Sequence, residues 1–187
     1  MEERKRVNDT QSREVSVRKA QPDDAEQMHD VHVWSVKMLC AGDYTPEQIE
    51  TWVGKLNPEK RRQRMRETEA IIFVAEKEEK IVGFSSLSEK KVRAVYVHPG
   101  YTRQGVGTIL LDAVEREAMA HHIQKLELQA SVTAVSFYQA PLYLEPNPGK
   151  IASAHQITAN LFIWNPILSS HAESRETTLH ITKTRQQ

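Results

Sequence analysis

Apolar and polar residues along this chain follow two periods, which separate predicted strands from predicted helices. Stretches that alternate with a period of two are typical of strands, and we predict them at residues 14–19, 70–76, 81–88, 91–97 and 125–130. Apolar residues at helical spacing predict one helix that begins near Pro22 and another at Pro46, with Trp34 and Trp52 on their buried faces. Asn57 precedes a third helix that is rich in basic residues.

The boundaries of these elements carry their own signals. Thr45 can cap a helix, Pro46 suits the first helical position, and Gln48 stands three residues after the cap. The polar residues 77–80 join two predicted strands and indicate a hairpin. Towards the C-terminus the pattern predicts a short helix and then two candidate strands, at residues 133–139, 156–164 and 177–183.

Gly105 and Gly107 lie in a turn between the predicted strand 91–97 and an apolar helix that extends to about His121. A helix N-terminus offers amides without intrahelical partners and a partial positive charge, and glycine lets a ligand approach the backbone closely. Strand, glycine turn and helix together indicate an anion site, most often for phosphate, to which Arg103 adds a positive charge. A plain tight turn is the alternative interpretation.

Two familiar phosphate motifs do not fit this turn. The P-loop requires lysine where Val106 stands, and the dinucleotide motif requires a third glycine where Leu110 stands. The sequence therefore disfavours both a nucleoside-triphosphate enzyme and a dinucleotide-dependent one.

Composition narrows the classes of partner. The 25 Lys and Arg residues balance 25 Asp and Glu residues, so no net charge attracts nucleic acid or an anionic membrane. The basic run Lys60–Arg66 is interpreted as a solvated helix face. The single cysteine, Cys40, is expected to be buried, and it excludes an internal disulfide and a multi-cysteine metal site. Since no apolar run could span a bilayer or act as a secretory signal, we expect a soluble, cytoplasmic protein. We also expect it to bind no metal.

The segment VYVHPGYTRQGVGTILLDAVEREA resembles the acetyl-coenzyme-A-binding motif of the GNAT N-acetyltransferases. The usual form of that motif is Arg/Gln-x-x-Gly-x-Gly/Ala at the end of the fourth strand. Gly105 and Gly107 match its two small positions. Thr102 stands in place of the Arg or Gln, and Arg103 and Gln104 follow it directly.

A second segment, LELQASVTAVSFYQAPLY, resembles the other signature of this family, in which a strand leads to Asn-x-x-Ala-x-x-Phe-Tyr and then a Gly-Phe pair. Ala134, Phe137 and Tyr138 fit this pattern. Ser131 stands in place of the asparagine, and a Leu-Tyr pair that begins at Leu142 replaces Gly-Phe. Two signatures in the right order and at the right distance are more specific than either alone.

The resemblance extends over about residues 14–143 and divides the chain into three parts. Residues 1–12 are expected to be a flexible N-terminal tail, and residues 13–143 to form the acetyltransferase domain. Residues 144–187 fit the family poorly and form either the last two strands of the sheet or a divergent, poorly ordered segment. The resemblance implies an α/β fold with a mixed, mostly antiparallel twisted sheet flanked by helices.

The resemblance also implies that acetyl-coenzyme A is the acyl donor. Amides of the glycine turn would hold its diphosphate, and the strands 91–97 and 125–130 would splay apart so that the pantetheine arm pairs with an exposed strand edge. The residues expected to bind the coenzyme are Val95, Tyr96, Val97, Thr102, Arg103, Gln104, Gly105, Val106, Gly107, Thr108 and Ser131.

The implied reaction is direct attack on the thioester by a primary amine of a small molecule or a peptide. A backbone amide near Val97 is expected to stabilise the oxyanion, and Tyr138 to protonate the departing thiolate. The amine, whose pKa in water is about 10.4, must first lose a proton. The general bases that position alone suggests are Asp43, Tyr44, Glu76, Ser86 and His98. A non-catalytic or weakly active acyl-coenzyme-A-binding module of the same fold is the alternative, and either could be a homodimer.

Overall fold

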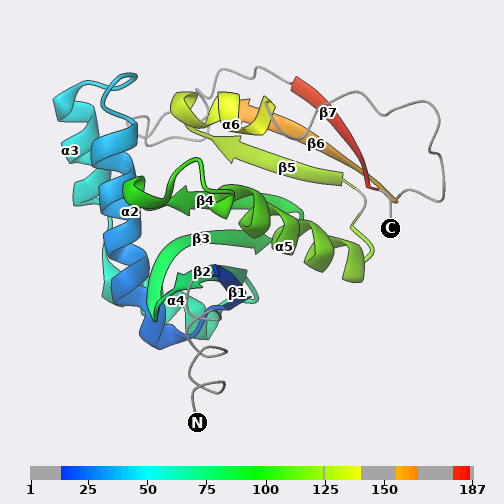
Figure 1. Ribbon diagram of the computed structural model, residues 1–187, viewed down its shortest axis with the longest axis horizontal. Helices are drawn as coiled ribbons and strands as arrows, with labels where there is room; N and C mark the ends of the chain where they lie inside the picture. Colours follow the sequence, from blue (N-terminus) through cyan, green and yellow to red (C-terminus); the bar gives the residue numbers. More distant parts are fainter. Residues whose placement is uncertain (1–13, 124, 140–154, 164–178, 186–187) are drawn as a thin grey trace, which may run out of the picture.

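The computed structural model describes residues 14–123, 125–139, 155–163 and 179–185, whose strands form one seven-stranded sheet (Figure 1). The strands follow one another across the sheet in sequence order. They are β1 (Ser16–Lys19), β2 (Ile71–Lys77), β3 (Lys80–Ser88), β4 (Lys91–Val97), β5 (Lys125–Ala130), β6 (His155–Ile163) and β7 (Leu179–Arg185). Neighbours are antiparallel except at β4–β5 and β5–β6, which are parallel. The predicted fold class, a mixed and mostly antiparallel sheet with helices, is confirmed.

Helices cover both faces of this sheet. The longer ones are α2 (Ala25–Leu39), α3 (Pro46–Gly54), α4 (Pro58–Glu67) and α5 (Val106–Ala120). Shorter elements are α6 (Val135–Gln139) and the 3₁₀ turns η1 (Pro22–Asp24), η2 (Pro99–Tyr101) and η3 (Val132–Ala134). On β3, Phe84 packs with Met28 of α2, whereas the hydroxyl of the next residue, Ser85, donates to the Leu110 carbonyl of α5 at 3.2 Å. Because successive strand residues point to opposite faces, α2 and α5 lie on opposite sides of the sheet.

Local chemistry sets the helix starts where the sequence predicts them. The Thr45 hydroxyl accepts from the Gln48 amide at 3.3 Å, and the Gln48 side chain accepts from the Thr45 amide at 2.8 Å. This reciprocal pair is the predicted capping box of α3. Asn57 caps α4 by accepting from the Lys60 amide at 2.8 Å.

The C-terminal strands lie close to the two that the pattern suggests. The sequence places them at residues 156–164 and 177–183, and the structure has β6 and β7 at His155–Ile163 and Leu179–Arg185. The division of the chain into a tail, a domain and a divergent segment stays a prediction. Residues 1–13 and the Leu-Tyr pair that begins at Leu142 lie outside the described residues.

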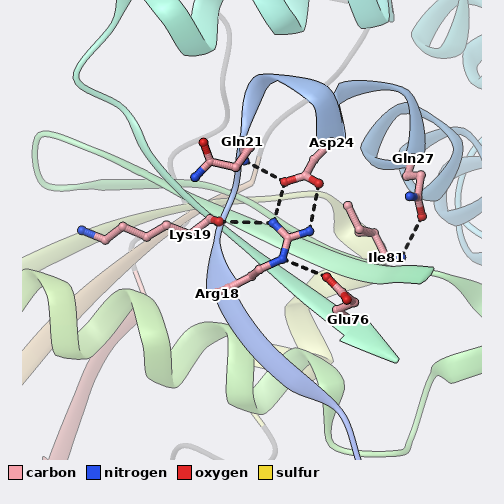
Figure 2. A network of polar contacts seen from close by, with 7 residues as sticks. All are labelled: Arg18, Lys19, Gln21, Asp24, Gln27, Glu76 and Ile81. Atoms are coloured by element: carbon pink, nitrogen blue, oxygen red, sulfur yellow. Dashed lines mark hydrogen bonds and ion pairs between the residues drawn. The ribbon is translucent and has the colours of Figure 1, made fainter. Parts of the chain in front are cut away.

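A polar network ties β1 to the start of α2 and to β2 (Figure 2). The Arg18 guanidinium donates to both carboxylate oxygens of Asp24, at 2.7 and 2.9 Å, and to Glu76 at 2.8 Å. The Gln21 amide donates to Asp24 as well, at 2.7 Å. The Arg18 guanidinium, which donates to this carboxylate, holds the pKa of Asp24 below its usual value. The ion pair therefore stabilises the fold above the normal carboxyl pKa, and its contribution is lost as the pH falls through the lowered pKa.

Asp24→Ala is expected to lower the free energy of unfolding by about 1–2 kcal/mol, because it removes a carboxylate that accepts three hydrogen bonds. The expected loss of free energy is moderate because 42 % of the Arg18 side chain is exposed to solvent. The exposed neighbour Asp23 supplies the control, and Asp23→Ala should change the free energy by less than about 0.5 kcal/mol. Urea denaturation at neutral pH measures both, and equal losses in the two variants would contradict the role given to Asp24.

Candidate active site

Strands β4 and β5 run side by side only at their starts. Among the described residues their pairing is limited to Lys91 with Glu127 and Val92 with Leu128, and the two ribbons then diverge (Figure 1). The register between β3 and β4 shifts at the same place, which leaves Arg93 as an extra residue in β4. Such a bulge bends a strand and ends its regular pairing. The second half of β4 therefore has one edge with which no strand among the described residues pairs.

The amides of Val95 and Val97 point to this open edge. The His98 amide donates to the Val82 carbonyl of β3 at 2.8 Å. Because successive amides of a strand point to opposite sides, the amide of Val97 is directed away from β3, and so is that of Val95. A strand edge with unpaired amides and carbonyls is costly unless another chain, a ligand or water pairs with it.

The side chains of β4 divide between the two faces of the sheet. Val95 and Val97 pack with the core that α5 completes, whereas Tyr96 packs with residues of α2 and α3. The Tyr96 ring contacts both His32 of α2, at 3.8 Å from centroid to centroid, and Phe84, at 5.3 Å, and these two rings also contact each other at 5.9 Å. Burial raises the pKa of Tyr96, so this phenol keeps its proton at neutral pH.

The glycine turn forms the start of α5. Gly105 is the residue before the helix and has φ +83°, a left-handed conformation that glycine adopts without steric cost. The helix bond nearest its start is donated by the Ile109 amide to the Gly105 carbonyl at 3.1 Å. The amides of Val106, Gly107 and Thr108 precede that bond, and Gly105 has no side chain to cap them.

The residues before Gly105 shape the turn. The Thr102 hydroxyl donates to the Pro99 carbonyl at 3.0 Å, and the Gln104 side chain donates to the Gly100 carbonyl at 3.0 Å. Arg103 is exposed and has φ +61°. A turn in which positive φ alternates with negative φ directs successive amides towards one side, as in known anion-binding turns.

Helix α6 packs on the first turn of α5. A Cβ atom at Gly107 would lie 2.8 Å from the Phe137 ring, so glycine permits this contact. Tyr138 follows Phe137 and is only 2 % exposed, with the two rings 5.0 Å apart. The structure therefore joins the glycine turn to the two aromatic residues of the second signature. The close packing at Gly107 is a reason for glycine that the sequence pattern does not reveal.

The loop between α2 and α3 contacts the turn that follows β5. The Asp43 carboxylate accepts from the Thr133 hydroxyl at 2.7 Å, and the Tyr44 hydroxyl accepts from the Val132 amide at 3.0 Å. Ser131 precedes this turn as the cap residue of η3. Burial raises the pKa of the nearby Cys40 thiol, as expected for an inert, buried cysteine.

The five residues suggested as general bases separate in space. Asp43 and Tyr44 lie at the loop that contacts η3, and Tyr44 belongs to the same cluster as Tyr96. Glu76 of β2 accepts a hydrogen bond from Arg18 of β1, so it lies at the opposite side of the sheet from β5. The His98 Nδ1 accepts from the Gly100 amide at 3.2 Å and so is not free to take a proton there. Ser86 lies on β3 opposite Ala94, at the bulge.

Two expectations about helix faces are wrong. Trp52 is buried at 3 % exposure as predicted, but Trp34 is 50 % exposed, because the buried stripe of α2 passes through Val31 and Ser35 instead. The basic run Lys60–Arg66 is not entirely a solvated face. Arg61 points inwards, with its guanidinium 4.8 Å from the centroid of the Phe84 ring.

The described residues contain neither a metal-binding cluster nor a membrane-spanning helix. In that part of the chain, no group of three or more His, Cys, Asp or Glu side chains is arranged to hold a metal ion. None of the helices described is both long and apolar enough to cross a membrane.

Comparison with known proteins agrees with this geometry. Residues 40–141 match the family model described as an acetyltransferase (GNAT) domain. The uncharacterized N-acetyltransferase YafP of Escherichia coli (strain K12) is 27 % identical over 125 residues, which are 67 % of this chain and 78 % of that protein. A GCN5-related N-acetyltransferase from Rhodopseudomonas palustris superposes with a TM-score of 0.64 at 26 % identity, covering 90 % of this chain and 92 % of its own. The PaiA N-acetyltransferase of Thermoplasma acidophilum, solved with coenzyme A, shares the fold with a TM-score of 0.57 at 17 % identity, covering 92 % and 99 % of the two chains.

Proposed function

Since the chain belongs to the GNAT acetyltransferase family, we propose that it transfers an acetyl group from acetyl-coenzyme A to the primary amine of a small molecule or peptide. The observation that carries this proposal is the open edge of β4, which lies next in sequence to a helix start with uncapped amides. Together these features suit a ligand with a diphosphate at one end and an amide-containing arm at the other.

We place the proposed binding site of the diphosphate at the start of α5. The amides of Val106, Gly107 and Thr108 would donate to its oxygens, and the helix dipole would favour its charge. Arg103, exposed on the turn, adds a cation. The PaiA acetyltransferase, which has the same fold, was solved with coenzyme A, and this supports an acyl-coenzyme A as the ligand.

The pantetheine arm is proposed to bind along the open edge of β4. The amide groups of the pantetheine arm would pair with the backbone of Val95 and Val97, as an added strand would. The thioester carbonyl would then lie near the Val97 amide, which is already directed to that edge. Such a donor stabilises the oxyanion that forms when the amine attacks.

Proton transfers complete the proposed reaction. A base takes a proton from the ammonium group, and the Asp43 carboxylate is the better candidate, because burial raises the pKa of Tyr44 and Glu76 pairs with Arg18. The neutral amine forms a C–N bond as the C–S bond breaks, and the Tyr138 hydroxyl gives its proton to the departing thiolate. The base releases the first proton to water, and Tyr138 recovers a proton through water from the nitrogen, which loses its second proton after the attack. The acetylated amine and free coenzyme A are the products.

A thiol-release assay with acetyl-coenzyme A and a panel of primary amines tests this function. The proposal expects free thiol in proportion to acetylated amine, with no release when the amine is omitted. Tight binding of acetyl-coenzyme A without thiol release on any amine would instead favour the acyl-coenzyme-A-binding module. The departures from the family motifs at Thr102, Ser131 and Leu142 are the reason for this second candidate.

A further inference from the structure

Arg61 is a largely buried cation that has no counter-ion among the residues the structure describes. It lies over the Phe84 ring, and its Nη2 is 3.0 Å from the Nδ1 of His32. No carboxylate among the described residues pairs with it, and its buried Nε has no hydrogen-bond partner. The next residue, Arg62, shows the usual arrangement, since it pairs with Glu26 and Glu59. A buried charge without a partner is costly, so the position of Arg61 requires a reason.

His32 adds a second buried donor, for which the described part of the chain supplies no acceptor. Its side chain is buried, and burial together with the charge of Arg61 lowers its pKa to about 3, so the imidazole is neutral at physiological pH. The Nδ1 accepts from the guanidinium, which assigns the single imidazole proton to Nε2. This Nε2 is buried and likewise has no hydrogen-bond partner in the described ranges. The cluster of Arg61 and His32 thus combines buried N–H donors with a positive charge, an arrangement that suits an anion.

This cluster borders the side of β4 from which an amine would approach. The His32 ring stacks on Tyr96, which projects from the open half of β4 towards α2 and α3. Val95 and Val97 face α5, the helix proposed to hold the diphosphate. With the coenzyme on that side, the acceptor reaches the edge from the side of Tyr96, His32 and Arg61.

We infer that the acceptor amine carries an anionic group, a carboxylate or a phosphate, and that Arg61 is its counter-ion, with the His32 Nε2 as a neighbouring donor. This inference rests on the proposed function. The planar guanidinium matches both kinds of anion through parallel hydrogen bonds. Amino acids and phosphorylated amines are therefore the substrate classes that the cluster fits.

Because Arg61 is largely buried, the inference includes a local movement of α4 that admits the anion. None of the residues of α4 is fully buried, and Met65 is its apolar contact with the core. Segments with few buried apolar contacts open locally at small cost. This movement would separate Arg62 of α4 from Glu26 of α2, with which it forms an exposed ion pair.

Matched substrates test the inference. Each α-amino acid is compared with its carboxamide, and phosphoethanolamine with ethanolamine, in the thiol-release assay with acetyl-coenzyme A. One anionic series is expected to have a KM about 100-fold lower than its neutral counterparts, and which series does so distinguishes carboxylate from phosphate. Equal use of charged and neutral members, or preference for the neutral ones, would overturn the inference while the acetyltransferase activity stands.

Variants of α4 test whether Arg61 causes the preference for anionic amines. Arg61→Gln should raise KM for the anionic amine about 100-fold and abolish the preference, and Arg61→Lys should restore part of it. Arg66→Gln removes an exposed arginine of the same helix and should leave the preference unchanged. The same loss in Arg61→Gln and Arg66→Gln would assign the effect to the overall charge of α4 and overturn the role of Arg61.

A binding measurement separates this inference from the function. If no amine is acetylated, the proposed function fails, and the same amines are then added to the protein saturated with acetyl-coenzyme A while its melting temperature is followed. Anionic amines that raise this temperature in the wild type and not in Arg61→Gln would support the site. No difference between charged and neutral amines, or between the two proteins, would overturn it.

Discussion

Replacing Tyr138 by phenylalanine is expected to lower kcat about 100-fold or more, while the affinity for acetyl-coenzyme A changes little. The proposed role of Tyr138 is to protonate the thiolate as it leaves, and phenylalanine has no proton to give. Because Tyr138 is buried at 2 % exposure and packs edge-to-face on Phe137, the phenylalanine ring fills the same space. The loss therefore reports on the hydroxyl and not on the fold.

Steady-state kinetics with a saturating amine measure this loss, and circular dichroism confirms that the variant is folded. Tyr101→Phe is the matched control, since Tyr101 is a partly buried tyrosine with an aromatic contact to His98 and no proposed part in the reaction. A wild-type kcat in Tyr138→Phe would remove the acid role and leave Tyr138 as a packing residue.

Replacing Val97 by proline is expected to lower kcat about 100- to 1,000-fold, the usual effect of removing one oxyanion donor. Proline has no amide hydrogen, and the Val97 amide is directed to the open edge of β4 and not to β3. The substitution therefore removes the proposed donor without removing a hydrogen bond of the β3–β4 ladder, which is the condition under which proline is tolerated in a strand.

Val97→Ala is the control for this variant, because it shortens the same side chain and keeps the amide. The proposal requires Val97→Pro to be far slower than Val97→Ala, with both proteins folded and both able to bind coenzyme A. Equal kcat values for the two would show that the Val97 amide does not stabilise the oxyanion.

Features that depend on neighbours in sequence were predictable. The capping box of α3 needs only Thr45 and Gln48, and the glycine turn needs only the change from strand period to helix period around Gly105. The strands and helices that flank the site follow from the same local patterns. Two short signatures, read together, identify the family.

Features that depend on residues far apart in the sequence were not predictable from its pattern alone. The end of pairing between β4 and β5 was expected from the family resemblance and not from any property of residues 91–97. The contact of Gly107 with Phe137 joins two helices, and only the structure gives a packing reason for that glycine.

Arg61 shows most clearly why a basic run can mislead. Helix α4 has almost no apolar residues, so its periodicity does not tell which side faces the protein. Met65, four residues after Arg61, is the one signal in the sequence that marks that side. Its partner His32 lies in a different helix, and no local pattern connects the two.

A titration of the isotope-labelled protein with acetyl-coenzyme A, followed at the backbone amides, tests the central claim most directly. The account predicts large, saturable shifts for the amides of Val106, Gly107 and Thr108, and for Val95 and Val97 on β4. The amides of β1, at the far edge of the sheet, should stay in place. Unchanged resonances for the start of α5 at saturating ligand would contradict the claim that these amides hold the coenzyme.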